Sequence, residues 1–467
     1  MEEKRTNSGP ELLVSLERGS GRPLRAQLED ALRAAVQQAR LRPSDHLPST
    51  RALAADLGCA RSVVVDAFAQ LVAEGYLVAR AGAGTVVAPR AGAGLRPAPS
   101  RPAEPTYRYD FRPGVPDLRL FPRVAWRRAT AEALDSAPAA TLGYIDPAGA
   151  RPLRQALAGY LARVRGVAAS ADEVMVVAGI AHGLGLLYRA LRVAGVAEMA
   201  IEEPGGAEQR MLVRRSGLEP VPVDVDGEGL RVDDLERTGV RAVLVTPAHQ
   251  FPLGAVLSPR RRAALVDWAR RRDGLIVEDD YDAEYRYDRR PVGAVQGLAP
   301  DRVCYLGTAS KTLAPGLRLG WLVPPPVWAG RIVEVRRRTD LGTSVVDQLA
   351  LARLIDSGNL DRHLRRTRPV YRDRRDALVR ALNAHLPEAT VSGVAAGLHA
   401  VVRLAAGTDE QRVLRSAAQR SIRVAGLSPA YLRGSSAGCG LVLGYAGVNE
   451  SAMPEAISML AEAVHET

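Results

Sequence analysis

Apolar residues in the N-terminal part of the chain recur with helical spacing in three stretches, and two strand-like runs follow. The predicted helices span residues 23–38, 47–58 and 61–74, and the predicted hairpin uses residues 75–78 and 81–87. Ser49 or Thr50 can serve as the N-cap of the second helix, and Gly58 ends it. This order of elements predicts a winged helix-turn-helix, in which the second helix of the motif enters the major groove of DNA.

From Tyr109 onward, short apolar runs alternate with helical patterns, which is typical of a mostly parallel α/β sheet. The predicted strands span residues 173–177, 198–201, 242–246, 275–278, 303–307 and 319–323. Residues 89–108 are rich in proline, glycine and alanine without periodicity, and they predict a linker. We therefore expect a DNA-binding domain at 12–88 and an α/β domain at 109–467. The latter should divide into a large subdomain at about 140–335 and a smaller C-terminal α+β subdomain at about 365–467.

Composition adds few constraints. The chain has 467 residues and a net charge of +11, which is compatible with a polyanionic partner. We expect no membrane partner and a cytoplasmic location, because no apolar run reaches the length of a membrane span and the N-terminus has no signal-peptide core. The three cysteines show no metal-ligand spacing, so we expect reduced thiols and no metal. Dense arginine at 336–338 and 362–375 predicts solvated helix faces, with an extended nucleic-acid surface as the alternative.

The scarcity of lysine singles out one residue as a candidate for chemistry. Of the 63 Lys plus Arg residues, only Lys4 and Lys311 are lysines. Arginine can replace lysine in a surface ion pair, but its guanidinium stays protonated and cannot act as a nucleophilic amine. Lys311 follows the predicted strand 303–307, and the Thr308 hydroxyl and the Arg318 guanidinium beside it can both bind a phosphate. The pattern indicates a site for an aldehyde cofactor that carries a phosphate. The alternative is that Lys311 is an ordinary surface residue.

Thr308-x-x-Lys311 followed by Arg318-Leu-Gly320 resembles the lysine motif of the fold-type I aminotransferases, which use pyridoxal 5'-phosphate (PLP). The resemblance implies that Lys311 forms a Schiff base with PLP, and that Thr308 and Arg318 hold the phosphate. It also implies a carboxylate beside the pyridine nitrogen, which lets the ring draw electrons from a substrate carbon. We assign that role to Asp279, with Asp280 as the second choice.

The same resemblance extends to residues at other predicted strand ends. Tyr281 is assigned to the phenolate oxygen of PLP. The glycine turn that opens a helix matches the aminotransferase phosphate cup, and its residues are Gly179, Ile180 and Ala181. His249 is either close to the cofactor or structural. Tyr144 matches the tyrosine that reaches the phosphate of the partner subunit, and this implies a homodimer with shared sites.

Residues 12–88 resemble the GntR-type DNA-binding domain, whose signature runs through Leu47-Pro-Ser-Thr-Arg51, Leu57-Gly58, Arg61, Ala67-Phe68, Glu74-Gly75-Tyr76 and Gly82-x-Gly84-Thr85. The resemblance implies contacts to double-stranded DNA from Arg51, Arg61 and Ser62. It also implies contacts from the wing, where Gly82 and Thr85 lie. Ala60 and Val63 depart from the hydroxyl residues usual there. Loss of the cap hydroxyl at Ala60 should weaken the start of the recognition helix by about 1 kcal/mol.

The whole arrangement resembles the MocR subgroup of GntR regulators, and the segments Asp110–Asp117, Glu278–Asp282 and Gly397–His399 have the form typical of it. The resemblance implies a dimeric transcription regulator that binds PLP as a sensor, often with an amino compound as effector.

Three positions depart from working aminotransferases: Gly206 replaces the aromatic residue that stacks on the ring, Val442 replaces the arginine that holds the substrate carboxylate, and Phe251 replaces the asparagine beside the phenolate. Without stacking or a carboxylate clamp, we expect little turnover of α-amino acids. One alternative is an aminotransferase with an accessory DNA-binding domain. A third hypothesis is a regulator that has lost its cofactor, because Gly206 removes ring stacking.

Overall fold

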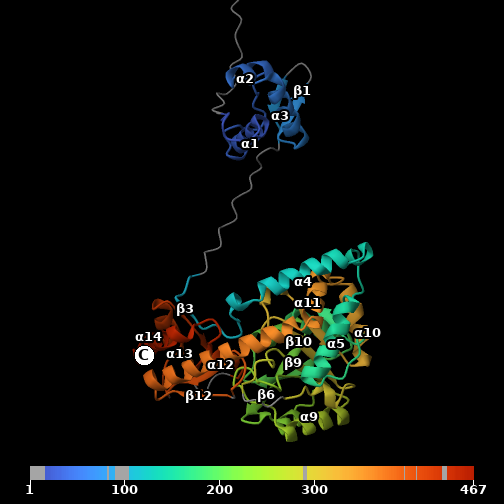
Figure 1. The fold of residues 1–467 in the computed structure, drawn as a ribbon, viewed down its shortest axis with the longest axis vertical. Coiled ribbons are helices and arrows are strands. Elements are labelled where there is room, and N and C mark those ends of the chain that lie inside the picture. Colours follow the sequence, from blue (N-terminus) through green and yellow to red (C-terminus); the bar gives the residue numbers. More distant parts are fainter. Residues whose placement is uncertain are drawn as a thin grey trace, which may run out of the picture. The chain divides into compact units, whose positions relative to one another are not determined.

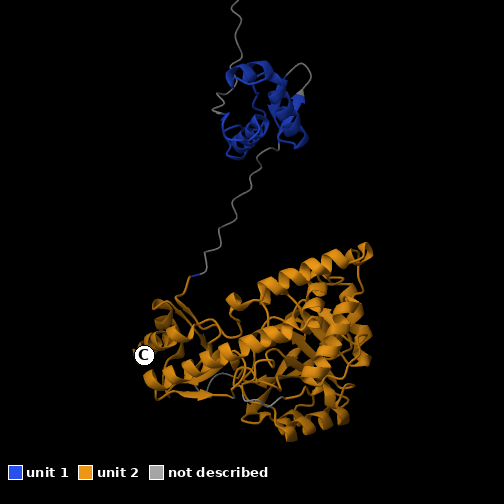
Figure 2. Ribbon diagram, in the orientation of Figure 1, with its two compact units in different colours: residues 1–105 blue, residues 106–467 orange. Residues whose placement is uncertain are grey.

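The computed structural model describes residues 16–80, 84–89, 105–287, 292–393, 395–405, 407–433 and 439–466. The chain divides into two compact units, residues 1–105 (unit 1) and residues 106–467 (unit 2), which Figure 2 shows in different colours. No helix in the described part of the chain is long and apolar enough to cross a membrane.

Unit 1 is a three-helix bundle with a two-stranded hairpin, which confirms the winged helix-turn-helix. Its elements are α1 (Leu24–Gln37), α2 (Thr50–Asp56), α3 (Arg61–Ala73), β1 (Leu77–Arg80) and β2 (Gly84–Val87). Apolar residues at the predicted helical spacing, among them Leu28, Leu32 and Phe68, form its core. The Ser49 hydroxyl caps α2 by accepting a hydrogen bond from the backbone N–H of Ala52 at 3.2 Å, whereas no side chain caps α3 at Ala60.

Unit 2 is built on an eight-stranded mixed sheet in the order β4-β11-β10-β9-β8-β5-β6-β7. The strands are β4 (Met175–Val177), β5 (Glu198–Glu203), β6 (Glu219–Asp226), β7 (Gly229–Leu230), β8 (Ala242–Val245), β9 (Leu275–Asp280), β10 (Val303–Thr308) and β11 (Gly320–Val323). Neighbours from β10 to β6 are parallel, while β11 runs antiparallel to both β10 and β4. The carboxyl ends of β4, β10, β9, β8 and β5 therefore meet along one edge, where ligands bind in open α/β sheets.

Helices cover the sheet, and a smaller sheet lies toward the C-terminus (Figure 1). The helices are α4 (Arg123–Ser136), α5 (Arg151–Arg165), α6 (Ile180–Val193), α7 (Ala207–Arg215), α8 (Val232–Glu236), α9 (Pro259–Arg271), α10 (Pro326–Arg337), α11 (Val345–Asp356), α12 (Asn359–His385), α13 (Glu410–Gln419) and α14 (Met453–His465). The smaller sheet consists of β12 (Thr390–Ser392), β13 (His399–Arg403), β16 (Gly440–Gly444) and β15 (Ala425–Gly426). Two remaining strands, β3 (Tyr109–Asp110) and β14 (Ile422–Arg423), pair with each other.

The prediction that the arginine-rich stretches form solvated helix faces was wrong for two of their residues. Arg336 on α10 is fully buried, where its guanidinium donates to the carbonyl of Val176 and pairs with Asp340 at 3.2 Å. Arg374 on α12 is also buried and pairs with Asp117 at 2.9 Å. These side chains join helices to distant backbone, because a guanidinium has enough donors to serve a carboxylate and a carbonyl at once.

Candidate cofactor site and nucleic-acid interface

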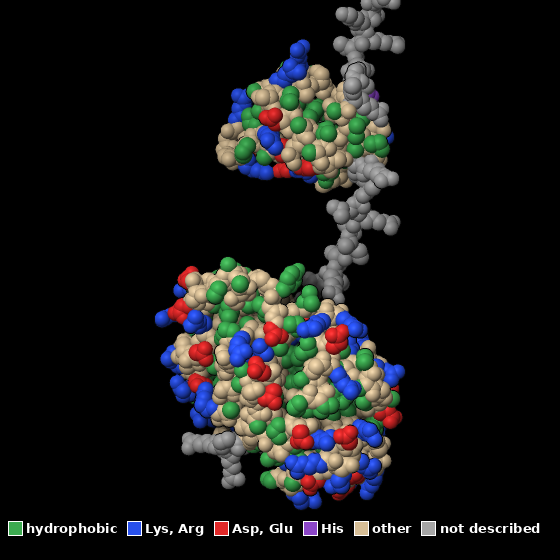
Figure 3. All heavy atoms as spheres, turned by 90° about the vertical axis from the view of Figure 1, so that its right-hand side faces the viewer, with side chains coloured by type: hydrophobic (Ala, Val, Ile, Leu, Met, Phe, Trp, Pro, Cys, Tyr) green, Lys and Arg blue, Asp and Glu red, His purple; other side chains and the backbone are tan. Residues whose placement is uncertain are grey.

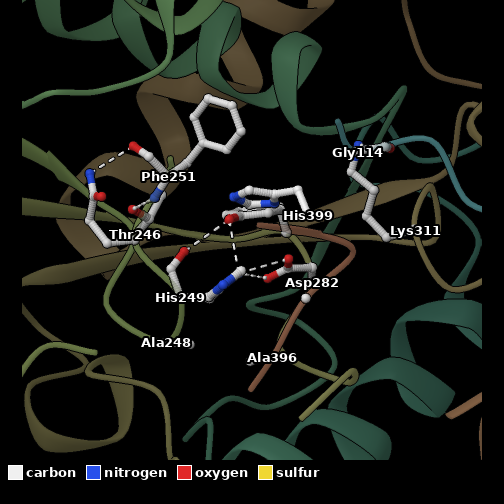
Figure 4. Close-up of polar contacts among 12 residues, drawn as sticks. Gly114, Thr246, Ala248, His249, Phe251, Asp282, Lys311, Ala396 and His399 are labelled. Carbon is white, nitrogen blue, oxygen red and sulfur yellow. Dashed lines mark hydrogen bonds and ion pairs between the residues drawn. The ribbon is translucent and has the colours of Figure 1, made fainter. Parts of the chain in front are cut away.

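Lys311 lies just beyond the end of β10, where the chain turns back toward β11. Its Nζ donates a hydrogen bond to the carbonyl oxygen of Gly114 at 2.5 Å (Figure 4). Gly114 has φ of +74°, and a Cβ at this position would lie 2.9 Å from Nζ, so glycine allows the backbone to approach the amine. Burial lowers the pKa of Lys311 below its ordinary value, which favours the uncharged amine that reacts with an aldehyde.

Asp279 and Asp280 end β9, the strand beside β10, and they have different partners. Asp280 accepts hydrogen bonds from Arg165 Nε and from the Tyr305 hydroxyl, both at 2.7 Å, so it belongs to a buried ion-pair network. The Oδ1 of Asp279 has no hydrogen-bond partner among the described residues, although the side chain is only 2% exposed. Burial raises the pKa of Asp279 to about 7. A buried acceptor without a donor fits the N–H of a protonated pyridine ring.

The residues predicted to bind the phosphate of PLP lie around the start of α6. Arg318 is exposed, and its Nη2 donates to the carbonyl of Ala178 at 2.5 Å. A Cβ on Gly179 would lie 3.0 Å from that guanidinium, so the glycine keeps room for the approach. The first N–H groups of α6, at Ile180 and Ala181, have no partners within the helix and lie at its positive end. This combination suits a phosphate.

Thr308 lies beside the same turn, and its hydroxyl is used within the chain. It donates to the Leu319 carbonyl at 3.1 Å and contacts the Ser310 hydroxyl at 2.8 Å. Ser310, which the sequence reasoning did not single out, therefore forms a hydroxyl pair with Thr308 next to Lys311. A Ser or Thr immediately before the lysine is the signal that could have revealed it.

His249 is part of a buried polar cluster with Asp282 and His399 (Figure 4). Its Nδ1 lies 2.9 Å from Asp282 Oδ2 and 3.2 Å from the Tyr281 hydroxyl, which also donates to the His249 carbonyl at 3.0 Å. The His399 ring lies 5.1 Å from the His249 ring, and burial lowers the pKa of His399 to about 4. The cluster fixes the position of the Tyr281 hydroxyl, and it includes Asp282 and His399, which the sequence reasoning did not assign to the site.

At two of the positions that depart from working aminotransferases, Gly206 and Val442, the structure shows which side chains occupy the surrounding space. Gly206 precedes α7, and a Cβ there would lie only 1.6 Å from Gln209 Oε1, so the Gln209 side chain occupies the space in front of the glycine. Gln209 Nε2 in turn lies 3.4 Å from Asp279 Oδ2. Val442 on β16 is 3% exposed and packs in an apolar cluster with Val401, Leu427 and Ala430. Neither position offers an aromatic ring or a cation.

Tyr144 is separate from these groups in the described chain. It is 98% exposed, and other exposed apolar side chains come from the same part of unit 2. They are Leu118, Val124, Leu134 and Leu142. Val124 and Leu134 belong to α4, which runs beside α11 along one side of unit 2 (Figure 1).

In unit 1 the predicted DNA contacts lie on the second and third helices and on the wing. Arg51 on α2 and both Arg61 and Ser62 on α3 are exposed, and Arg61 Nε lies 3.3 Å from the Thr50 hydroxyl. Thr85 is on β2 and is half-buried. Gly82 falls outside the described residues. On the face of unit 2 seen in Figure 3, basic and acidic side chains are interspersed, so this face does not offer an extended basic surface to nucleic acid.

Comparison with known proteins agrees with both halves of this description. The family model for bacterial regulatory proteins of the gntR family matches residues 24–87, and the model for aminotransferase class I and II matches residues 115–460. The probable rhizopine catabolism regulatory protein MocR of Rhizobium meliloti is 36% identical over 476 residues, covering 97% of this chain and 96% of that protein. The chain belongs to the MocR subgroup of the GntR regulators.

Other relatives of this MocR-type regulator support both parts. The pyridoxine biosynthesis transcriptional regulator PdxR of Corynebacterium glutamicum is 34% identical over 443 residues, with 94% of this chain and 95% of that protein covered. Among solved structures, the kynurenine aminotransferase of Pyrococcus horikoshii, in complex with PMP, matches with a TM-score of 0.71 and 27% identity. That match covers 78% of this chain and 92% of the enzyme. The fold-type I aminotransferase architecture of unit 2 is therefore confirmed.

The residues at the sheet edge fit PLP, the cofactor that an aminotransferase fold implies. Three chemical features meet the needs of an aldehyde, a pyridine nitrogen and a phosphate. They are the half-buried amine of Lys311, the buried Asp279 oxygen that has no donor among the described residues, and the cationic, glycine-bounded turn at Arg318.

Proposed function

We propose that this MocR-type regulator uses unit 2 to hold PLP and sense an amino compound, and uses unit 1 to bind double-stranded DNA. The observation that carries the proposal is that the half-buried Lys311 amine and the unpartnered Asp279 oxygen both lie at the ends of adjacent strands. The same polypeptide carries a DNA-reading unit. A protein that reads chromosomal DNA works in the cytoplasm.

Each site residue would have a defined role. PLP, when bound, supplies an aldehyde that combines with amines and a ring that withdraws electrons. Lys311 would hold the aldehyde end of PLP, and Asp279 would keep a proton on the pyridine nitrogen. Arg318 and the N–H groups of Ile180 and Ala181 would neutralise the phosphate. The Tyr281 hydroxyl would donate to the phenolate oxygen in place of its hydrogen bond to the His249 carbonyl.

We infer a sensor with little transamination from the two positions where working aminotransferases hold the substrate carboxylate and stack on the cofactor ring. Val442 provides no guanidinium for an α-carboxylate, and Gly206 provides no ring to stack on the cofactor. Transamination requires a substrate held in one orientation, and loss of a bidentate clamp removes that orientation. Binding of an amine needs less, so ligand sensing can persist where turnover is lost.

The decisive experiment is titration of the purified protein with PLP. We expect the visible absorbance band of lysine-bound PLP, and borohydride reduction followed by peptide mass spectrometry should place the label on Lys311. Lys311→Ala should abolish both. Lys4→Ala is a matched control, because Lys4 is the only other lysine. A band that persists in Lys311→Ala would overturn the assignment.

DNA binding is tested with the same protein. A selected DNA site should be shifted by the wild type and bound at least about fivefold more weakly by Arg61→Ala, because a base or phosphate contact by arginine contributes about 1–3 kcal/mol. Arg338→Ala, an exposed arginine on unit 2, is the control.

Robust amino transfer to 2-oxo acids without specific DNA binding would favour the second candidate, an aminotransferase with an accessory domain. Lys311, Asp279 and Tyr281 favour this second candidate, because an aminotransferase needs the same residues.

We also propose that the regulator is a homodimer that shares its sites. The exposed apolar side chains in the segment 118–144 support this, because exposed apolar surface is favoured at interaction sites. Tyr144, almost fully exposed in the single chain, would reach the phosphate of the partner's PLP. Light scattering should give the mass of two chains. The double variant Val124→Asp/Leu134→Asp should give one chain and weaken PLP binding.

A further inference from the structure

Three carboxylates act electrostatically on the Lys311 amine, and they differ in what they are available to bind. Asp279, Asp282 and Glu208 all oppose the effect of burial on the pKa of Lys311. Asp282 is paired with His249 at 2.9 Å. Asp279 is assigned above to the pyridine nitrogen. Glu208 therefore remains as the carboxylate near Lys311 without an assigned role.

Glu208 lies in the first turn of α7, between Gly206 and Gln209, whose side chain reaches Asp279. The Glu208 side chain is exposed and forms no ion pair with any residue that the structure describes. Its sequence neighbour Gln209 thus contacts Asp279, while the Glu208 side chain is exposed to solvent. A carboxylate in this position is free to pair with a ligand that enters from outside.

Among the described residues, the loop that contacts the start of α7 presents no unpaired guanidinium. The N–H of Gly205 donates to the Ala430 carbonyl at 2.9 Å, and Ala430 packs in the same apolar cluster as Val442. Arg210, on the same helix turn, donates to the carbonyls of Pro429 at 2.7 Å and Ala430 at 3.2 Å. The cation nearest to Glu208 along α7 is therefore used to hold the loop, and the carboxylate is the available charge at the start of α7.

We propose that the effector is an amine that carries a second positive charge and no α-carboxylate, and that Glu208 binds this second charge. The inference rests on the proposed function, because one amine of the ligand must meet PLP near Lys311. A carboxylate on the ligand would be repelled by Glu208, and Val442 provides no guanidinium to bind it. A second ammonium would instead gain an ion pair.

Three probes with the same four-carbon chain separate these cases: 1,4-diaminobutane, butylamine and 4-aminobutyrate. We expect calorimetric titration of the PLP-loaded protein to show that 1,4-diaminobutane binds about fivefold more tightly than butylamine, as for a partly exposed ion pair, and that 4-aminobutyrate binds most weakly. The advantage of the diamine should shrink at high salt. Equal affinities, or a preference for 4-aminobutyrate, would overturn the inference.

Variants at Glu208 sharpen the test. Glu208→Gln should remove the advantage of 1,4-diaminobutane over butylamine, and Glu208→Arg should shift the preference to 4-aminobutyrate. Glu198→Gln, at another exposed glutamate at the start of β5, should keep the wild-type order. A diamine preference that survives Glu208→Gln contradicts the assignment. The visible PLP band is measured first on each sample. Its absence in the wild type would overturn the proposed function, whereas a normal band without diamine preference would overturn only this inference.

Discussion

The groups expected to bind PLP and those expected to bind a substrate are kept to different degrees. The phosphate side, made of Gly179, Thr308 and Arg318, comes from strand ends of the large sheet and keeps the groups expected of an aminotransferase. The substrate side, made of Gly206, Phe251 and Val442, has lost its ring, its amide and its cation. The proposed function therefore assigns cofactor binding and substrate chemistry to separate parts of the fold, so that one can change without the other.

The largest expected effect is on the phosphate side. Arg318→Ala should weaken PLP binding by about 100-fold, because it removes charge-assisted hydrogen bonds to the phosphate of about 1.5–3 kcal/mol in total. Equilibrium PLP titration measures the effect, with Arg338→Ala as a control for the loss of one positive charge. A loss below tenfold would mean that the phosphate lies elsewhere, and the contrast between the two sides would no longer hold.

PLP binding through Asp279, the residue proposed to contact the pyridine nitrogen, should depend on pH. Burial raises the folded-state pKa of Asp279 to about 7, above its ordinary value of 3.8. In the PLP-free protein the carboxyl therefore stays protonated up to about pH 7, and its contribution to folding stability falls as the pH rises from about 4 to about 7. PLP needs the ionised form, so raising the pH from 6 to 8 should tighten PLP binding about tenfold through this group.

Asp279→Asn isolates that contribution. The variant should bind PLP more weakly at both pH values, and its pH dependence should be about tenfold smaller than that of the wild type. Glu278, whose pKa burial also raises to about 7, is present in both proteins, and Asp279 is not among the groups that shift its pKa. An equal pH dependence in the two proteins would remove Asp279 from the pyridine nitrogen.

Features set by local pattern could be predicted from the sequence. The strand that leads to Lys311, the helix that begins after Gly179 and the N-cap at Ser49 all follow from short-range periodicity and capping chemistry. Strand β6 was missed because Pro220 and Pro222 interrupt its pattern, and proline in a strand normally argues against one.

Features that depend on distant contacts could not be predicted in this way. The contact of Lys311 with Gly114 joins residues 197 positions apart. The burial of Arg336 depends on a carbonyl of β4, 160 positions away. A single sequence carries no signal for such pairs, because they arise from the packing of whole elements. For the same reason, the position of Gln209 over Gly206 became visible only in the structure.

The smallest expected effect tests whether the substrate side can be restored. The backbone at Gly206 has φ of −65°, so a side chain is sterically allowed there once Gln209 moves. Gly206→Tyr/Gln209→Ala should bind PLP about fivefold more tightly than Gln209→Ala alone, because aromatic stacking contributes about 0.5–1.5 kcal/mol. Gly206→Tyr alone should gain less, since the tyrosine must displace Gln209 and break its contact with Asp279. Transamination should stay low in all three variants, because Val442 still provides no carboxylate clamp. If the double variant gained no affinity, the cofactor ring would not lie against position 206, and the weakness of the substrate side would need another cause.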